Sequence, residues 1–274
     1  MDGEREFREA LAGIRSEFEV VDHLARLFAA ESIAKAWSLH TEVMRRYGFD
    51  RLVYIYSPLS RSFGALEDCL VLHNVPEGYI TEYLRQGHWR LPYFLSRAEA
   101  EGLDCMPWHT PPTETMSASE ARAFAFRRSY GMLAGYSIDL GPLTANGRAG
   151  IGLCARIELD QDAVDRVWAR HGQTIRVLNK ALHLRVCTLP HEPEGAALSP
   201  RQREVLEWVS AGKSTRDIAI LMNVTVATVE KHLRLARERL GAETTAEALM
   251  KATVRNQILR LDFSVARRKT PRHE

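Results

Sequence analysis

The sequence predicts an α/β N-terminal domain, an α-β-α sandwich with an antiparallel sheet, followed by an all-α C-terminal domain built on a helix-turn-helix. Three observations predict this: helix-period apolar residues on both sides of strand-like segments, a segment with two prolines and a glycine, and closely spaced helix caps after it. A chain of 274 residues, 45% of them hydrophobic, can build two hydrophobic cores. We expect domains at 1–186 and 199–262, a linker at 187–198 and a basic tail at 263–274.

The N-terminal domain begins with residues at helical spacing. Apolar side chains recur with this period from Phe18 to Tyr47, including Val21 and Phe28, and Gly48 ends the run. The next segment, 51–57, is aromatic and β-branched, which favours a strand. The domain is therefore predicted to place helices before its first strand.

Two more strands and a long helix complete this domain. Residues 136–140 and 150–157 are extended stretches separated by Asn146-Gly147, a dipeptide typical of hairpin turns. Residues 162–185 return to helical spacing. We therefore expect helices on both sides of an antiparallel sheet.

Cap residues divide the C-terminal domain. Ser199-Pro200 places a helix cap before a proline at the first helical position, and glycine and serine or threonine caps follow it at short intervals. The expected helix boundaries are Ser199 to Gly212, Ser214 or Thr215 to Asn223, and Thr225 to Leu240, where Gly241 ends the helix. Three short helices with these turns predict a helix-turn-helix.

The third of these helices has an apolar stripe and a charged stripe. Apolar residues fall at i, i+4, i+7 and i+11 from Val229, and the charged stripe can enter a DNA major groove. Lys and Arg donate to guanine there, and Glu accepts from cytosine. The expected contacts are Glu230, Lys231 and Arg234 to bases, and Lys213, Thr228 and His232 to phosphates.

Charge is distributed unevenly along the chain. Residues 196–274 contain 15 Lys plus Arg and 9 Asp plus Glu, a net charge of +6, whereas residues 1–195 have a net charge of −4. A basic domain suits double-stranded DNA as a partner. The basic tail either adds phosphate contacts or only solubilises the chain.

Several classes of protein are excluded or disfavoured by the sequence. There is no apolar leader and no apolar run near ~18 residues, so we expect a cytoplasmic protein with no membrane partner. The four cysteines lack C-x-x-C pairing, so we expect free thiols and no metal. The order of acidic residues expected of a phosphoacceptor receiver and the motifs of hydrolases and P-loop enzymes are missing, so we expect no enzyme and no cofactor.

Aromatic residues are concentrated in the middle of the N-terminal domain. Pockets for small apolar ligands are lined in this way, although each aromatic residue alone is more readily explained as part of the core. The candidate ligand-binding aromatics are Tyr54, Tyr56, Tyr79, Tyr83, Trp89, Tyr93 and Trp108.

The C-terminal segment resembles the tetrahelical helix-turn-helix of LuxR-type regulators. The resemblance rests on Leu198–Arg201, Trp208–Ser214 and Thr225–His232, and it covers about a quarter of the chain. It implies a fourth helix, which Thr245–Ile258 fits with Leu249, Met250, Thr253 and Val254 on one face. In this family the fourth helix often serves dimerisation.

The N-terminal domain resembles, through fewer residues, the autoinducer-binding domain of LuxR-type receptors, which bind N-acyl homoserine lactones. The family's Trp and Tyr, four positions apart, match Tyr79 and Tyr83, its second Trp matches Trp108, and a glycine matches Gly135. The family's Asp-Pro pair, whose carboxylate accepts the ligand's amide N–H, falls on residues 90–93, which read Arg-Leu-Pro-Tyr.

Loss of this aspartate leaves the ligand chemistry open. A buried N–H without an acceptor costs about 1 to 3 kcal/mol. Either Ser137, Asp139 or the Tyr79 hydroxyl replaces the acceptor, or the site takes a different ligand, or side chains fill it. The resemblance thus implies an atypical quorum-sensing regulator with Gly135 in its ligand site, to which we add Ser137 as a candidate acceptor.

We expect a homodimeric transcription factor that senses a small hydrophobic signal, either an acyl-homoserine lactone or another molecule. One alternative is a ligand-independent regulator controlled by a protein partner or by its expression level. Another is an enzyme fused to a DNA-binding module. A small molecule that copurifies with the protein favours the signal-sensing regulator. Only catalytic turnover would favour the enzyme fused to a DNA-binding module.

Overall fold

The computed structural model describes residues 19–58, 69–88, 102–109, 117–141, 147–191 and 197–258. The chain divides into two compact units, Met1–Val186 and Cys187–Glu274. Among the described residues, no helix is both long and apolar enough to cross a membrane.

The first unit contains a five-stranded antiparallel sheet. Its strands are β1 (Phe49–Ser57), β2 (Leu70–His73), β3 (Cys105–Pro107), β4 (Gly135–Asp139) and β5 (Arg148–Ala155), in the order β2-β1-β5-β4-β3. The antiparallel sheet is thereby confirmed, and the three predicted strands appear to within two residues at each end. The two edge strands were not predicted, because they are too short to show an alternating pattern.

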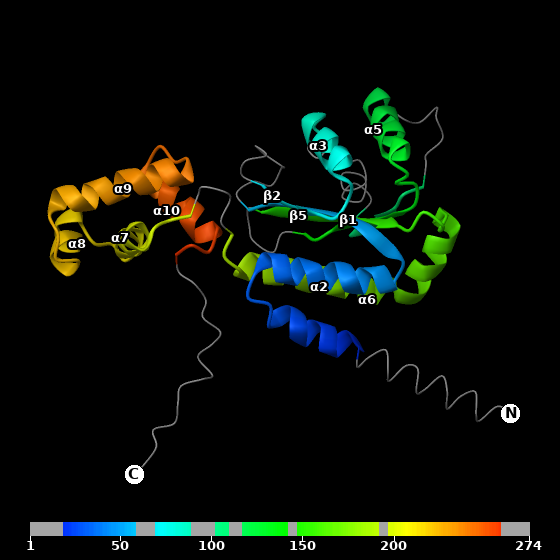
Figure 1. The fold of residues 1–274 in the computed structure, drawn as a ribbon, viewed down its shortest axis with the longest axis horizontal. Coiled ribbons are helices and arrows are strands. Elements are labelled where there is room, and N and C mark those ends of the chain that lie inside the picture. Colours follow the sequence, from blue (N-terminus) through cyan, green and yellow to red (C-terminus); the bar gives the residue numbers. More distant parts are fainter. Residues whose placement is uncertain are drawn as a thin grey trace, which may run out of the picture. The chain divides into compact units, whose positions relative to one another are not determined.

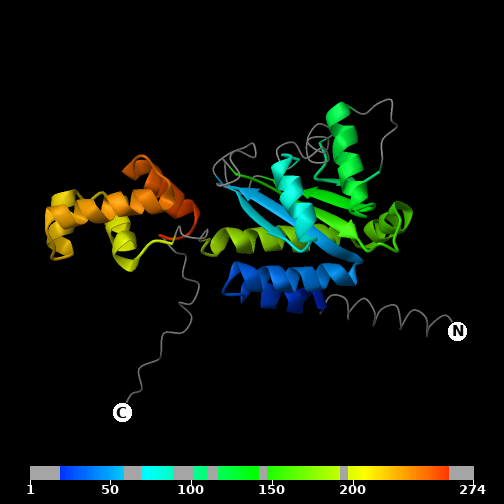
Figure 2. The same ribbon diagram turned by 45° about the horizontal axis from the view of Figure 1, so that its top comes forward.

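Helices cover both faces of this sheet, as Figures 1 and 2 show. On one face lie α2 (Ile33–Arg46) and α6 (Gln161–Thr188), and on the other lie α3 (Glu77–Arg85) and α5 (Ala118–Ser129). We call these the α6 face and the α3 face. The predicted α-β-α sandwich is therefore confirmed.

Side chains alternate between the two faces along each strand. On β4, the Tyr136 ring stacks on Trp168 of α6 at a centroid distance of 3.8 Å. The neighbouring Ser137 instead accepts a hydrogen bond from Trp108, which packs with α3 residues. One strand therefore contributes to two separate sets of contacts.

The predicted helical run before β1 consists of two helices. Residues 19–28 are helical, residues 29–32 are not, and the Ser32 hydroxyl caps α2 by accepting a hydrogen bond from the Lys35 N–H. Two of the apolar residues at helical spacing in the first helix, Val21 and Phe28, are 63% and 50% exposed. The helix buries Leu27 and His23 instead, and the His23 ring lies 6.2 Å from that of His40 in α2.

The second unit contains four helices in its described part: α7 (Pro200–Ser210), α8 (Thr215–Leu221), α9 (Val226–Leu240) and α10 (Thr245–Val254). Each begins with a hydroxyl that accepts a backbone N–H, and the four caps are Ser199, Ser214, Thr225 and Thr244. Gly241 ends α9 with a φ of 61°, a left-handed conformation that glycine adopts without strain. The helix-turn-helix predicted from these caps is confirmed.

The fourth helix is shorter than expected and buries a different face. It ends at Val254, and Asn256 follows in the left-handed region with a φ of 50°. The buried residues are Ala248 and Ala252, whereas Met250 is 50% exposed. Small alanines allow close packing against the neighbouring helices, whereas the predicted face consists mostly of larger residues.

The first residues of the expected linker pack within the second unit. The Asn256 side-chain amide donates to the carbonyls of Cys187 and Leu189, at 2.7 and 3.0 Å. The backbone N–H of His191 donates to the Arg255 carbonyl at 2.9 Å. The end of α10 thus holds residues 187–191 in place.

Candidate functional site

The surface of α9 presents the three expected base readers. Val229, Ala236 and Leu240 are buried, whereas Glu230, Lys231 and Arg234 are exposed. The Arg234 guanidinium donates to the carboxylate of Glu238, one turn further along, at 2.5 Å. One side of the helix thus packs into the unit and another is free to meet a partner.

Two of the three expected phosphate contacts, Lys213 and Thr228, lie near helix N-termini. Lys213 is exposed and directly precedes Ser214, the cap of α8. The Thr228 N–H donates to the hydroxyl of the α9 cap, Thr225, and the two hydroxyls lie 2.9 Å apart. His232 is partly buried. Helix N-termini attract anions, so Lys213 and Thr228 occupy positions suited to phosphate.

A small hydrophobic core fixes α9 relative to the two preceding helices. Its buried members are Val205, Ile218, Ala219, Met222 and Val229. Between α8 and α9, Asn223 has a φ of 53°, and the Val224 N–H donates to the Ala219 carbonyl at 2.9 Å. The exposed stripe of α9 is therefore presented by a packed support.

The α3 face carries a cluster of aromatic and apolar side chains, which we call the aromatic cluster. Its buried members are Val75, Tyr79, Ile80, Trp108, Met132 and Cys154, with Val53, Val71, Tyr83, Leu84, Phe126 and Tyr130 packed against them. The Tyr79 ring stacks on Tyr83 of α3 and on Phe126 of α5, with centroids 5.6 and 5.1 Å apart. Two expected ligand residues, Tyr79 and Tyr83, thus lie side by side.

Trp108 lies against two glycines of the sheet. A Cβ on Gly135 would lie 2.9 Å from the indole ring, and one on Gly152 would lie 3.3 Å from it. The indole N–H donates to the Ser137 hydroxyl at 2.8 Å. The structure therefore brings together the expected ligand residues Trp108, Gly135 and Ser137, with Trp108 packed in the same cluster as Tyr79.

The other candidate aromatics are not brought to this cluster. Tyr54 and Tyr56 lie on the α6 face, where the Tyr54 hydroxyl is 2.7 Å from His183 Nδ1 and the Tyr56 ring is 5.0 Å from the His183 ring. Grouping them with Trp108 needs correction, because alternate residues of β1 face opposite sides. On the α3 face, Val53 joins the cluster and Ile55 packs against Tyr83 and Leu84. Trp89 and Tyr93 lie outside the described residues, as do 90–92 and the tail 263–274.

A cationic residue that sequence reasoning missed lies in the same region. Arg127 of α5 is 7% exposed, and its guanidinium carbon lies 4.6 Å from the centroid of Trp108 and 4.8 Å from that of Phe124. Burial lowers the pKa of Arg127 to about 10, so the side chain stays charged at neutral pH. Burial also raises the pKa of Tyr79, whose hydroxyl therefore stays protonated.

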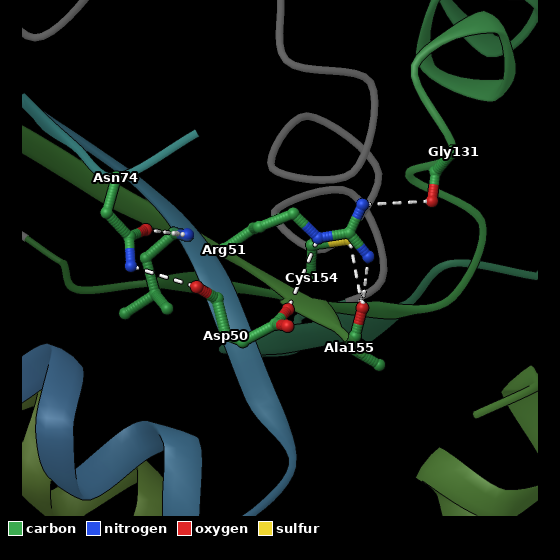
Figure 3. A network of polar contacts seen from close by, with 7 residues as sticks. Asp50, Arg51, Asn74, Gly131, Cys154 and Ala155 are labelled. Atoms are coloured by element: carbon green, nitrogen blue, oxygen red, sulfur yellow. Dashed lines mark hydrogen bonds and ion pairs between the residues drawn. The ribbon is translucent and has the colours of Figure 1, made fainter. Parts of the chain in front are cut away.

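Arg51 anchors the end of α5 to the sheet, as Figure 3 shows. Its guanidinium donates to the carbonyls of Gly131 and Ala155, at 3.1 and 2.5 Å, and Nε donates to the Asp50 carboxylate at 3.2 Å. Gly131, with a φ of 66°, follows Tyr130, the C-cap residue of α5. The network thus fixes the turn that carries α5 into β4.

A second polar network joins the cluster to the start of α6. The Gly135 N–H donates to the side-chain oxygen of Gln161 at 3.0 Å, and the Gln161 amide donates back to the Gly135 carbonyl at 3.2 Å. Asp165, one turn later, accepts from the Tyr136 hydroxyl at 3.0 Å and lies 2.9 Å from His109 Nε2. These contacts therefore couple the positions of Gly135 and of the Trp108-His109 segment to the position of α6.

Two family models match the chain. The model described as "Autoinducer binding domain" matches residues 32–186, more than half of the chain, and the model described as "Bacterial regulatory proteins, luxR family" matches residues 196–252. Their boundaries follow the division into two units.

Curated relatives match across both units. The chain is 26% identical over 72% of its length to y4qH of Sinorhizobium fredii, an HTH-type transcriptional regulator by name, and the match spans 60% of that protein. It is 22% identical to the transcriptional activator YukR of Yersinia ruckeri, over 66% of this chain and 83% of YukR. It is 25% identical to the quorum sensing-dependent regulator RpaR of Rhodopseudomonas palustris, over 87% of this chain and 93% of RpaR.

Among solved structures, the chain matches Escherichia coli SdiA with a TM-score of 0.48 at 16% identity, over 88% of this chain and 98% of SdiA.

Proposed function

The chain belongs to the LuxR family of bacterial regulatory proteins and carries an autoinducer-binding domain, and from this premise we propose that it is a transcriptional regulator whose DNA binding is controlled by a small hydrophobic signal. The observation that carries the proposal is the combination of an exposed polar stripe on α9 with a cluster of aromatic side chains in the other unit.

We propose that α9 enters the major groove of DNA. Lys231 and Arg234 donate to guanine, Glu230 accepts from cytosine, and Lys213 and Thr228 contact phosphates. His232 is a weaker candidate for a phosphate contact because it is partly buried. Exposure of the three base readers on a helix packed through its other side supports this docking.

We propose that the signal binds on the α3 face. Tyr79, Tyr83 and Trp108 form its aromatic walls, and Gly135 and Ser137 lie beside the indole ring. Trp89 and Tyr93 stay candidates from sequence alone. The name of RpaR, a quorum sensing-dependent regulator, supports a diffusible signal as the class of ligand.

We propose that two copies of the chain bind two half-sites about one helical turn apart. Exposed apolar side chains support a second copy as partner: Val21 and Phe28 lie seven residues apart on the first helix, and Met250 is exposed on α10. The signal acts by its difference in affinity for the states that bind DNA well and poorly.

The DNA half of the proposal is tested with an operator selected from random DNA by the full-length protein. The single substitutions Lys231→Ala and Arg234→Ala should each weaken DNA binding by about 1 to 3 kcal/mol, roughly ten- to a hundredfold in affinity. Arg170→Ala, which removes an exposed cation from α6, should leave it unchanged. Gel-shift affinity of the double variant equal to that of the wild type would refute the proposed docking.

The signal and the dimer are tested by native mass spectrometry of the full chain with acyl lactones and with an extract of the source cells. A dimer that gains the mass of a small molecule supports the proposal. A protein that binds its operator but takes up nothing favours control by a protein partner or by expression level, and a monomer on DNA contradicts the two-copy model.

A further inference from the structure

The first turn of α9 presents an apolar surface to solvent. Val226, the first residue of the helix, is 40% exposed, and Ala227 after it is exposed as well. The exposed base readers that follow, Glu230, Lys231 and Arg234, are all charged. The proposed DNA-binding surface therefore changes from apolar to charged along the helix.

The helix period places Ala227 in line with the base readers. At about 100° per residue, Ala227 lies roughly 20° around the helix from Arg234 and roughly 40° from Lys231. Val226 lies to one side of this line, roughly 40° from Glu230. Ala227 is thus the N-terminal member of the stripe that is proposed to face the bases.

The cap of α9 fixes the position of this first turn. The Thr228 N–H donates to the Thr225 hydroxyl at 3.2 Å, and the two hydroxyls lie 2.9 Å apart. The side chains of Val226 and Ala227 have no donor, so they can bond neither to phosphates nor to the polar edges of bases. What they offer a partner is a set of methyl groups held in place by the cap.

The major groove contains one apolar group that suits such a surface. Thymine carries a methyl group on its groove edge, and alanine is among the residues that contact it. The N-terminal residues of a recognition helix contact base edges. Contact between two methyl groups removes both from water, which favours binding.

Resting on the proposed docking of α9, we infer that Ala227, flanked by Val226, reads the methyl group of a thymine. Four helical residues span about 6 Å and one base-pair step spans about 3.4 Å. This thymine therefore lies within about two base pairs of the pair that Lys231 reads. The protein thus selects a base at a position where its side chains make no hydrogen bond.

The test uses the full-length protein and an operator selected from random DNA. Each thymine is replaced in turn by deoxyuridine, which lacks only the methyl group, and dissociation constants are measured by fluorescence anisotropy at one salt concentration. Loss of one buried methyl group should weaken binding roughly three- to fivefold at one thymine in each half-site. That thymine should lie within about two base pairs of the pair at which Lys231→Ala relaxes the base preference.

Two glycine variants assign the effect to Ala227. Ala227→Gly removes the contacting methyl group and should bring the ratio of the deoxyuridine and thymine dissociation constants to about one. Arg239→Gly, at an exposed position away from the stripe in the same helix, should retain the wild-type ratio. Because each ratio compares two DNAs on one protein, a loss of helix stability cancels. If Ala227→Gly does not fold, the deoxyuridine scan of the wild type still decides.

The outcomes separate this inference from the proposed docking. Equal affinity for the thymine and deoxyuridine operators at every position would overturn the inference, while weaker binding by Lys231→Ala and Arg234→Ala would leave the docking in place. A ratio that survives in folded Ala227→Gly would overturn the role of Ala227. Unchanged binding by the double variant of Lys231 and Arg234 would refute the docking, and the inference with it.

Discussion

Replacing Gly135 with alanine tests the close contact between Trp108 and the sheet. The new Cβ would lie 2.1 Å from the Leu153 carbonyl oxygen and 2.9 Å from the indole ring. Because the first contact is with the backbone of β5, no side-chain rotation relieves it, and β4 and β5 must separate by about 1 Å. Overpacking of a core costs about 1 to 3 kcal/mol, and a clash with backbone belongs at the upper end of that range.

Gly152→Ala is the matched control. Its Cβ would lie 3.3 Å from the Trp108 ring and 4.0 Å from the nearest backbone atom among its closest contacts, so a shift of a few tenths of an ångström accommodates it. We expect Gly135→Ala to lower the free energy of unfolding by about 3 kcal/mol and Gly152→Ala by less than about 1 kcal/mol.

The assay is urea unfolding of the full-length protein followed by circular dichroism, with hydrogen exchange of peptides from β4 and β5 to localise the effect. Exchange in Gly135→Ala should accelerate in these two strands first. A Gly135→Ala protein within about 0.5 kcal/mol of the wild type, or a larger loss in Gly152→Ala, would refute the reasoning.

Three other changes have expected outcomes. Tyr54→Phe removes the hydroxyl that meets His183 Nδ1 in the core and should cost about 1 to 3 kcal/mol in urea unfolding; an unchanged midpoint would contradict this hydrogen bond. Burial lowers the pKa of His183 to about 4 and that of His40 to about 3, below the unfolded value near 6.5. Protons therefore bind the unfolded chain more readily than the folded chain. The free energy of unfolding should be largest above about pH 6.5 and should fall as the pH drops towards 4. A free energy of unfolding that stays constant from about pH 7.5 to 4.5 would argue against buried neutral histidines. Thr225→Ala removes the cap of α9 and should lower the free energy of unfolding by about 1 kcal/mol, whereas Thr225→Ser should retain most of it; equal losses in the two variants would exclude capping by the hydroxyl.

The parts of the fold that could be predicted carry local signals. The caps Ser199 and Thr225 and the stop at Gly241 act within a few residues, so the sequence around them predicts the helices of the second unit. The alternation of Ile151, Leu153 and Ala155 likewise predicts the strand β5, which the structure buries on both faces. Edge strands such as β3, three residues long, owe their conformation to pairing with β4, and no pattern within three residues reveals a partner.

The candidate site was predicted in part. Tyr79, Trp108 and Gly135 were found through spacing shared with a family, and Ser137 was proposed as one possible replacement for the missing aspartate. The contacts that join these residues are tertiary. Arg127 was missed because an Arg-Arg pair on a helix is typical of a solvated face, and only packing on Trp108 makes it part of the site.

The contact between Trp108 and two glycines has an evolutionary consequence. Where the sheet presents bare backbone, no side chain is available to be exchanged, and Gly135 has no room to acquire one. Under the proposed binding of the signal on this face, we expect changes in the preferred signal to arise mainly in α3 and α5, whose side chains can be replaced without disturbing the strands. Divergent descendants of this chain should differ at positions such as 83, 126 and 127 and keep glycine at 135.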